Sequence, residues 1–126
     1  MPQVAPIVLT DNAAVDHTFD PQNVEKGVAY YAAHSVDGTP EKDGRLSAGL
    51  RTQPNSARRG SVKIQLPVIR SVDGVDVVVD TNILEINARM SSKSTDVERS
   101  QLTSLGAASL NDTFIQALLN DLSGPY

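Results

Sequence analysis

The sequence predicts an α+β fold in which an antiparallel sheet comes first and two helices follow. Apolar residues alternate with polar ones through most of residues 45–90, which is the period expected of half-buried strands. Beyond Met90 the apolar spacing becomes three or four residues, which is the period of a helix. Strands followed by helices favour an antiparallel sheet with helices over one face. At 126 residues the chain is expected to form one domain.

The first twenty residues predict a β-hairpin. IVLT at 7–10 and VDHTF at 15–19 are short β runs, and the DNAA between them supplies turn residues. The next four residues, DPQN at 20–23, are expected to form a loop.

The segment GVAYYAA at 27–33 fits either a strand or a helix, and Gly27 with the tyrosine pair favours a strand. Successive side chains of a strand point to opposite faces. One of Tyr30 and Tyr31 is therefore expected in the core and the other at the surface. A stacking role for the exposed ring is the weaker alternative.

Two alternating runs with basic polar sides form the centre of the predicted sheet. DGTPEKDG at 37–44 has the composition of a turn, and RLSAGLR at 45–51 follows it. QPNSA interrupts the pattern, and SVKIQL at 61–66 then repeats it. The polar side of both runs carries Arg, Lys and Ser, so it would face a ligand or solvent while the apolar side lies beneath the helices.

The last part of the predicted sheet is a hairpin. Asp73-Gly74 lies between valines and has the composition of a two-residue type I′ turn, which needs a positive φ at both positions. VDVVVDTNILEINARM follows, at 75–90. At about 3.3 Å per residue one strand of this length would exceed about 50 Å, so a bend or bulge is expected near Asp80–Asn82.

Two helices are predicted between residues 94 and 123. Thr95 and Glu98 have the spacing of a capping box at the start of the first helix, and Gly106 is a weak point within it. The second helix is expected from about Leu110 to Leu122, where Gly124-Pro125 would stop it.

The charge is distributed unevenly along this acidic chain. Residues 42–70 hold seven cations and one anion, which gives +6, whereas the rest holds four cations and 14 anions, which gives −10. A basic patch on a protein of net charge −4 indicates one surface that meets a polyanion. The alternative is an ordinary solvated charged face.

The composition argues against an enzyme. The chain has no Cys and two histidines without a co-ligand at metal-site spacing, so surface or turn roles are expected for His17 and His34. No Ser-His-Asp arrangement or Gly-rich phosphate loop is found. No catalytic residue, metal or cofactor is therefore predicted. The N-terminus lacks the pattern of a secretory signal and no apolar run reaches about 18 residues, so a soluble, cytosolic protein without a membrane partner is expected.

An ordered set of segments carries a resemblance to a known family. The segments are IVLTDN, PQNVEKGVAYY, GLRTQPNSARRGSVKIQLPVI, STDVERSQL and a C-terminal PY. Together they span nearly the whole chain, and they resemble the coat proteins of the small single-stranded RNA bacteriophages, the leviviruses.

The resemblance implies a specific architecture and assembly. It implies an N-terminal hairpin at 1–20, a five-stranded antiparallel sheet within 27–90 and two C-terminal helices within 94–123. Two chains would join their sheets edge to edge and interlock their helices, so that the helices of each pack on one sheet face of the dimer. Dimers would assemble in the bacterial host cytoplasm into a T=3 icosahedral virion shell whose sheets face single-stranded genomic RNA.

The resemblance also assigns RNA-binding positions, all on the polar sides of the predicted strands. It implies that Ser47, Ser61 and Lys63 line a pocket for an unpaired adenine, with Val28 as its apolar wall. Arg51 and Arg59 would contact phosphates, and Glu85 would contact a base. The predicted RNA-binding residues are Val28, Arg45, Ser47, Gly49, Arg51, Arg59, Ser61, Lys63 and Glu85.

The sequence departs from the family pattern at three places. Gly49 stands where the family can carry a base-contacting Ser, and Thr81 or Ile83 where it can carry a stacking Tyr. Loss of that aromatic would remove about 1–3 kcal/mol of stacking per base. The turn at Ser71–Gly74 is also shorter than the loop that often shapes contacts around the symmetry axes of family shells.

The predicted function is that of a major capsid protein. The chain is expected to form homodimers, assemble around single-stranded RNA and repress translation of the replicase by binding an RNA hairpin. The alternative is a dimeric regulatory RNA-binding protein that does not assemble into a shell.

Overall fold

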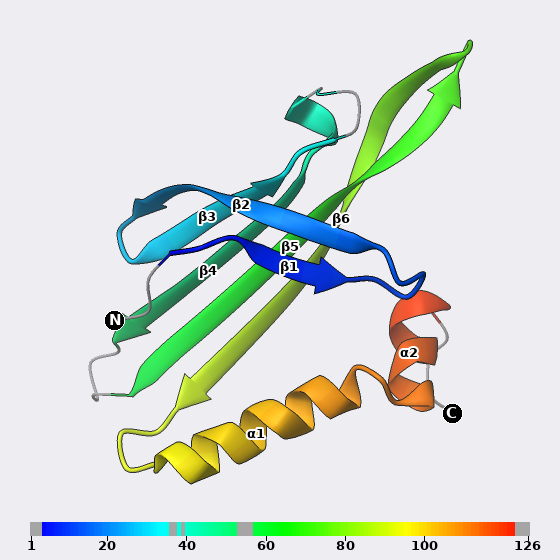
Figure 1. The fold of residues 1–126 in the computed structure, drawn as a ribbon. Helices are drawn as coiled ribbons and strands as arrows, with labels where there is room; N and C mark the ends of the chain where they lie inside the picture. Colours follow the sequence, from blue (N-terminus) through cyan, green and yellow to red (C-terminus); the bar gives the residue numbers. More distant parts are fainter. Residues whose placement is uncertain (1–3, 36–37, 39, 53–56, 123–126) are drawn as a thin grey trace. The chain divides into compact units, whose positions relative to one another are not determined.

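The computed structural model describes residues 4–35, 38, 40–52 and 57–122. The chain comprises a sheet unit within residues 1–89 and a helical unit within residues 90–126. Six strands form one sheet in their order along the chain (Figure 1). They are β1 (Ile7–Thr10), β2 (Asp16–Glu25), β3 (Val28–Ala33), β4 (Gly44–Thr52), β5 (Arg58–Val72) and β6 (Val75–Met90), with a short 3₁₀ helix, η1 (Pro40–Lys42), before β4. The predicted antiparallel sheet followed by two helices is confirmed.

The loop expected at residues 20–23 is wrong, because these residues belong to strand β2. Residues 16–19 of β2 pair with β1, and residues 20–25 pair with β3, so that one strand serves two partners. The register shifts between Pro21 and Asn23, and proline is tolerated at such an irregularity because it has no N–H to give to a ladder. The sheet therefore has six strands where a hairpin and five further strands were expected.

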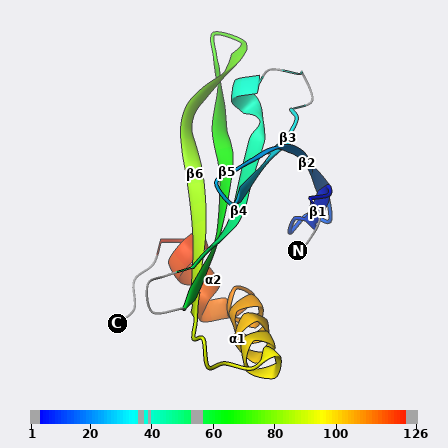
Figure 2. The same ribbon diagram turned by 90° about the vertical axis from the view of Figure 1, so that its left-hand side faces the viewer.

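The core of the sheet unit forms where the β1–β2 hairpin meets the sheet. Phe19 of β2 packs against Tyr31 of β3 and Leu46 of β4, and all three are buried. Ile7 and Ile64 pack around them. Figure 2 shows the sheet from its side, with β1 and the start of β2 curled over one face. The hairpin thus covers part of one sheet face with apolar side chains.

Two tight hairpins hold the register of the sheet. Asp73 and Gly74 have φ of 54° and 78°, so the turn predicted between β5 and β6 is confirmed. Lys26 and Gly27, with φ of 52° and 78°, form an equivalent turn between β2 and β3 that the composition did not indicate. Glycine adopts this conformation without a steric penalty, which explains the second position of both turns.

The hairpin of β5 and β6 is longer than its neighbours. Strand β4 pairs with residues 58–65 of β5, and the remaining part of β5 continues beyond it (Figure 1). Strand β6 has 16 residues without a break, so the bend or bulge expected near Asp80–Asn82 does not interrupt it.

The helical unit contains α1 (Asp96–Ser109) and α2 (Thr113–Asn120). The capping box is confirmed, because Glu98 N donates to Thr95 Oγ1 at 3.3 Å and Thr95 N donates to Glu98 Oε1 at 2.9 Å. The second of these hydrogen bonds is the main reason that the pKa of Glu98 lies below its usual value. Helix α1 continues through Gly106 without a break.

Helix α2 begins later than the sequence predicted. It starts at Thr113 rather than near Leu110, because the Asp112 carboxylate accepts from Phe114 N at 2.9 Å and Ile115 N at 3.3 Å. The predicted stop signal Gly124-Pro125 lies outside the described residues. Among the residues that the structure describes, no helix is long and apolar enough to cross a bilayer.

Acid is expected to loosen the turn between β1 and β2 selectively. Asp11 Oδ1 accepts from Ala13 N at 2.8 Å and Val15 N at 3.0 Å, and Asp11 Oδ2 lies 2.7 Å from His17 Nε2. The hydrogen bond with His17 is the largest cause that holds the pKa of Asp11 below its ordinary value. A carboxyl with a lowered pKa stabilises the fold above its unfolded pKa, which is about 3.9, and loses this contribution as the pH falls through its folded pKa.

Amide hydrogen exchange at Ala13 and Val15 measures this effect. We expect exchange to accelerate below about pH 4 beyond the intrinsic trend, and Asp11→Asn to remove this extra acceleration. Protection that is identical in both proteins at every pH would contradict the assignment.

Candidate nucleic-acid interface

Three rows of side chains cross β3, β4 and β5 on one sheet face. Directly opposed residues of an antiparallel pair lie on the same face, so the register identifies each row. The rows are Val28, Gly49 and Ser61; Tyr30, Ser47 and Lys63; and Ala32, Arg45 and Gln65. Arg51 and Arg59 oppose each other at the end of the same face. We call this surface the polar face.

All nine residues that were predicted to bind RNA lie together on the polar face. The register places eight of them there directly, on β3, β4 and β5. Glu85 of β6 joins them because its Oε1 lies 3.9 Å from Lys63 Nζ. The strands thus assemble, from four separate stretches of sequence, one surface that holds every candidate.

The pair formed by Lys63 and Glu85 is open to solvent. Their side chains are 40% and 57% exposed. Such a pair contributes about 0–1 kcal/mol to the stability of the fold. A phosphate group can therefore compete with Glu85 for the Lys63 ammonium at little cost in free energy. The strand register places Lys63 on the polar face, and the interaction with Glu85 does not neutralise its charge permanently.

Arg51 and Arg59 form a like-charged pair across β4 and β5. They are direct partners in the register, and both are exposed. Like charges in opposed positions destabilise a sheet. An anion between or above the two guanidinium groups would relieve this repulsion, so this end of the polar face has the charge that suits a phosphate group.

The opposite face of the same strands is apolar and incompletely covered. Leu50, Leu66 and Ile86 are exposed, although large apolar side chains dominate this face. Leu84 and Ile86 share it because they alternate with Glu85 along β6. The two faces therefore differ in chemistry as the sequence predicted.

Apolar side chains of the helical unit are exposed as well. No residue of α1 or α2 is buried, and Val97, Leu105 and Phe114 are 78%, 62% and 56% exposed. A monomeric soluble protein rarely exposes so many large apolar side chains, and such exposure is typical of surfaces that take part in interactions.

Gly49 occupies a position without room for a side chain. A Cβ built there would lie 2.9 Å from Val28 Cγ2 and 3.0 Å from the carbonyl oxygen of Gly27. The first distance is shorter than real Cβ contacts, and the second, to a backbone atom, is tighter than most of them. Gly49 therefore offers a ligand no side chain, unlike the serine that the family pattern allows at this position.

We expect Gly49→Ala to lower the free energy of unfolding by about 1–3 kcal/mol, because overpacking outweighs the better strand propensity of alanine. Gly60→Ala is the matched control on β5, since a Cβ at Gly60 meets nothing within 4 Å. Urea denaturation at one protein concentration measures the free energy of unfolding of both variants. Equal stability of the two variants would contradict the packing around Gly49.

A hollow of about 680 Å³ opens on the polar face, where predicted residues form part of its lining, and the sequence did not indicate it. Its lining includes Gln22, Asn23, Tyr30, Arg45 and Gln65, in addition to Ser47 and Lys63. The sequence signal that could have found it is the alternation in GVAYYAA, which predicted one exposed tyrosine. The structure shows that Tyr31 is the core residue and Tyr30 the exposed one.

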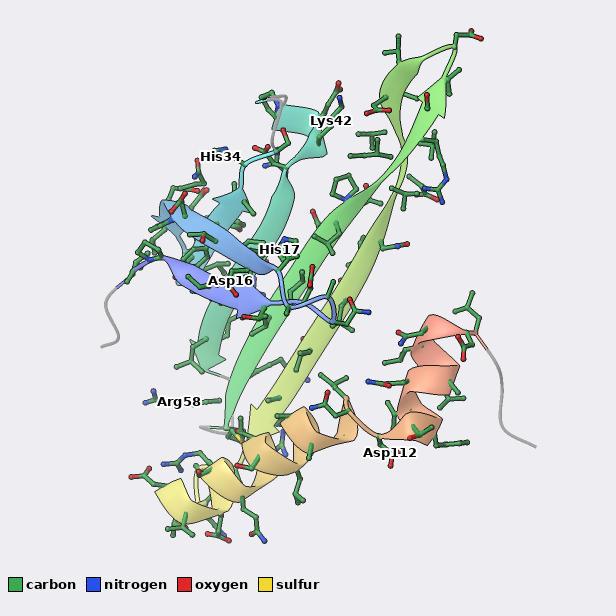
Figure 3. All side chains as sticks on the ribbon, turned by 45° about the vertical axis from the view of Figure 1, so that its right-hand side comes forward. Asp16, His17, His34, Lys42, Arg58 and Asp112 are labelled. Carbon is green, nitrogen blue, oxygen red and sulfur yellow. The ribbon has the colours of Figure 1, made fainter. Side chains whose placement is uncertain are left out.

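His34 and Asp43 belong to the lining of this hollow, and they interact with each other. The buried Asp43 carboxylate accepts from Ser35 N at 2.8 Å, and its other oxygen lies 3.2 Å from His34 Nδ1. The hydrogen bond from Ser35 N is the main cause that lowers the pKa of Asp43. In Figure 3, His34 and Lys42 lie at one end of the strands and Arg58 at the other. The turn role expected of His34 agrees with its interaction with Asp43.

Comparison with known proteins identifies the family. The family model described as levivirus coat protein matches residues 2–126. The capsid protein of Pseudomonas phage PRR1 is 29% identical in an alignment over 114 residues, with a coverage of 86% for each chain.

Solved structures share the fold over the whole chain. A chain of the virus-like particle of Beihai levi-like virus 21 matches with a TM-score of 0.87 and 23% identity over 99% of both chains. A chain of the virus-like particle of bacteriophage ESE058 matches with a TM-score of 0.85 and 24% identity, over 99% of this chain and 100% of the other. The capsid protein of bacteriophage GA matches with a TM-score of 0.68 and 20% identity, over 95% of each chain. With the sheet, the two helices and a family match that spans nearly every residue, the chain belongs to the levivirus coat protein family.

Proposed function

We propose that this chain is the major capsid protein of an RNA bacteriophage, and that it dimerises and assembles into a T=3 icosahedral shell around single-stranded RNA. The observation that carries the proposal is the separation of the sheet into two faces. One face carries Arg45, Arg51, Arg59 and Lys63, and the other is apolar and incompletely covered.

The polar face suits the RNA side of a shell. It is broad, and its exposed cations Arg45, Arg51 and Arg59 lie on neighbouring strands. An extended polyanion can bind many such groups at once, whereas the acidic remainder of the protein repels it. The shell would therefore bind RNA on its inner surface and expose the acidic parts elsewhere.

The apolar surfaces and the sheet edge support a homodimer. Strand β6 is the last in the strand order of the described sheet, and it is 16 residues long. A long edge strand invites pairing with another chain. Two copies that pair along β6 would extend the sheet, and their helices would cover the exposed apolar side chains.

Translational repression and the site of assembly complete the proposal. A loop of an RNA hairpin presents unpaired bases, which small polar residues such as Ser47 and Ser61 can read while cations hold the backbone. Binding of such a hairpin would repress translation of the replicase. Assembly would take place in the cytoplasm of the bacterial host. In this function the chain has no catalytic role.

The salt dependence of RNA binding tests the RNA part of this proposal. If Arg51, Arg59 and Lys63 of both chains of a dimer bind phosphates, the logarithm of affinity should fall with the logarithm of salt concentration with a slope of about −4. Filter binding of a single-stranded RNA between about 50 and 200 mM salt measures the slope. Binding that is absent, or that does not change with salt, would contradict the proposed face.

A further inference from the structure

The dipeptide Asp-Gly occurs three times in the chain, at residues 37–38, 43–44 and 73–74. An aspartyl side chain can react with the backbone nitrogen of the next residue, and glycine leaves that nitrogen unshielded because it has no Cβ. The three pairs therefore share one intrinsic chemistry, and the fold decides which of them can react. Asp37 lies outside the described residues, whereas both residues of the other two pairs are described.

The pair Asp43-Gly44 is held in an unreactive state. The Asp43 side chain is buried, accepts from Ser35 N at 2.8 Å and lies 3.2 Å from His34 Nδ1. The hydrogen bond from Ser35 N, with a smaller contribution from His34, lowers the pKa of Asp43, so its carboxyl stays ionised and is a poor electrophile. Gly44 is also crowded, since a Cβ there would lie 3.2 Å from Leu66 Cδ2.

The pair Asp73-Gly74 is in the opposite state. Both residues are exposed in the turn between β5 and β6, beyond the part of β5 that pairs with β4 (Figure 1). Within the part of the chain that the structure describes, no hydrogen bond or ion pair holds the Asp73 carboxylate. A Cβ at Gly74 would meet nothing within 4 Å. The hydrogen bond that closes such a turn joins the flanking residues, which leaves the N–H of Gly74 available.

We propose that Asp73 is a site of spontaneous isomerisation to isoaspartate. Gly74 N forms a bond to Asp73 Cγ while a Cγ–O bond breaks, and that oxygen leaves as water with the amide proton and the carboxyl proton. A second water molecule then opens the succinimide ring. Cleavage of the Cγ–N bond restores aspartate. Cleavage of the bond between the main-chain carbonyl carbon and nitrogen gives isoaspartate, in which the chain runs through Cγ and the former main-chain carbonyl is a free carboxylate.

The product does not fit the turn in which it forms. Isoaspartate lengthens the backbone by one atom, whereas the turn depends on the positive φ of both Asp73 and Gly74. The flanking residues Val72 and Val75 are therefore expected to lose protection from amide exchange as the protein ages. The reaction needs only water, so it does not depend on RNA binding or on assembly.

Ageing of the unmodified full-length protein tests this inference. The protein is incubated at physiological temperature and mildly acidic pH, and peptide mapping with electron-transfer fragmentation distinguishes isoaspartate from aspartate at each position. We expect isoaspartate to accumulate at least about tenfold faster at Asp73 than at Asp43, because an opening free energy of roughly 1.4 kcal/mol at Asp43 already gives this factor. In guanidinium chloride the two positions should react at similar rates, since the dipeptide is the same.

Asp73→Asn provides a second measurement. Asn-Gly suits a type I′ turn, so the hairpin should be retained. The same ring then forms with loss of ammonia in place of water, and ammonia leaves an amide more readily than water leaves a carboxylate. Isoaspartate should therefore appear at position 73 faster than in the unmodified chain. Absence of isoaspartate at this position in both proteins, equal amounts at Asp43 and Asp73 in the folded protein, or a difference that persists after unfolding would overturn the inference.

Discussion

Deletion of residues 91–126 is expected to abolish soluble dimer. The deletion removes both helices, and in the proposed dimer these cover apolar side chains of the sheet such as Leu66, Leu84 and Ile86. Each large apolar side chain that is no longer covered loses about 1.5–3 kcal/mol of stabilisation from burial. Three such losses sum to about 4.5–9 kcal/mol, which is comparable with the whole stability of an ordinary domain, about 5–15 kcal/mol. Size-exclusion chromatography of the soluble fraction measures the outcome.

A single substitution tests the same interface with less disturbance. Phe114 of α2 is 56% exposed in the single chain, so Phe114→Asp is expected to leave the chain folded locally but to prevent dimerisation. Ser100→Asp on α1 is the control, because it adds the same charge at an exposed polar position. For the deletion of residues 91–126, a truncated chain that is soluble, dimeric and cooperative in unfolding would show that the helices do not cover the sheet.

Arg59→Ala is expected to lower RNA affinity about tenfold while Arg58→Ala leaves it nearly unchanged, because one phosphate-binding cation is worth roughly 1.4 kcal/mol. The two residues are neighbours at the start of β5, yet they point to opposite faces. The variants remove the same charge, so the net charge of the protein cannot explain a difference between them. The polar face is thereby tested against a matched control on the other face of the same strand.

Lys63→Ala extends this test to the middle of the polar face. It is expected to weaken RNA binding by a similar factor and to reduce the steepness of the salt dependence by about 0.7 for each phosphate that is no longer neutralised. Dimers should persist in both Arg59→Ala and Lys63→Ala, which analytical ultracentrifugation can verify. Unchanged RNA retention in Arg59→Ala and Lys63→Ala would rule out the polar face as the RNA-binding surface.

The parts of the fold with strong local signals were predictable from sequence. Asp73-Gly74 forms its turn, and Thr95 with Glu98 caps α1, because each feature depends on a few neighbouring residues. The strand alternation also placed the candidate residues on one face, since the period of two fixes the side on which each residue lies.

The features that were not predictable depend on pairing between distant segments. Pro21 and its neighbours have the composition of a loop, but pairing with β3 keeps them in a strand. The turn at Lys26-Gly27 carries a residue that rarely takes a positive φ, so the local composition did not indicate it. The hollow at Tyr30 arises only when β2, β3, β4 and β5 lie side by side, and no single segment contains its pattern.

The size and nucleic-acid content of the purified recombinant protein test the central claim most directly. Size-exclusion chromatography with negative-stain electron microscopy gives the size, and the ratio of absorbance at 260 and 280 nm gives the RNA content. The proposed function predicts uniform particles far above dimer mass, with a nucleic-acid spectrum and RNA that ribonuclease does not reach. A clean dimer that never assembles, at any salt concentration or with added RNA, would contradict it and favour a regulatory RNA-binding protein.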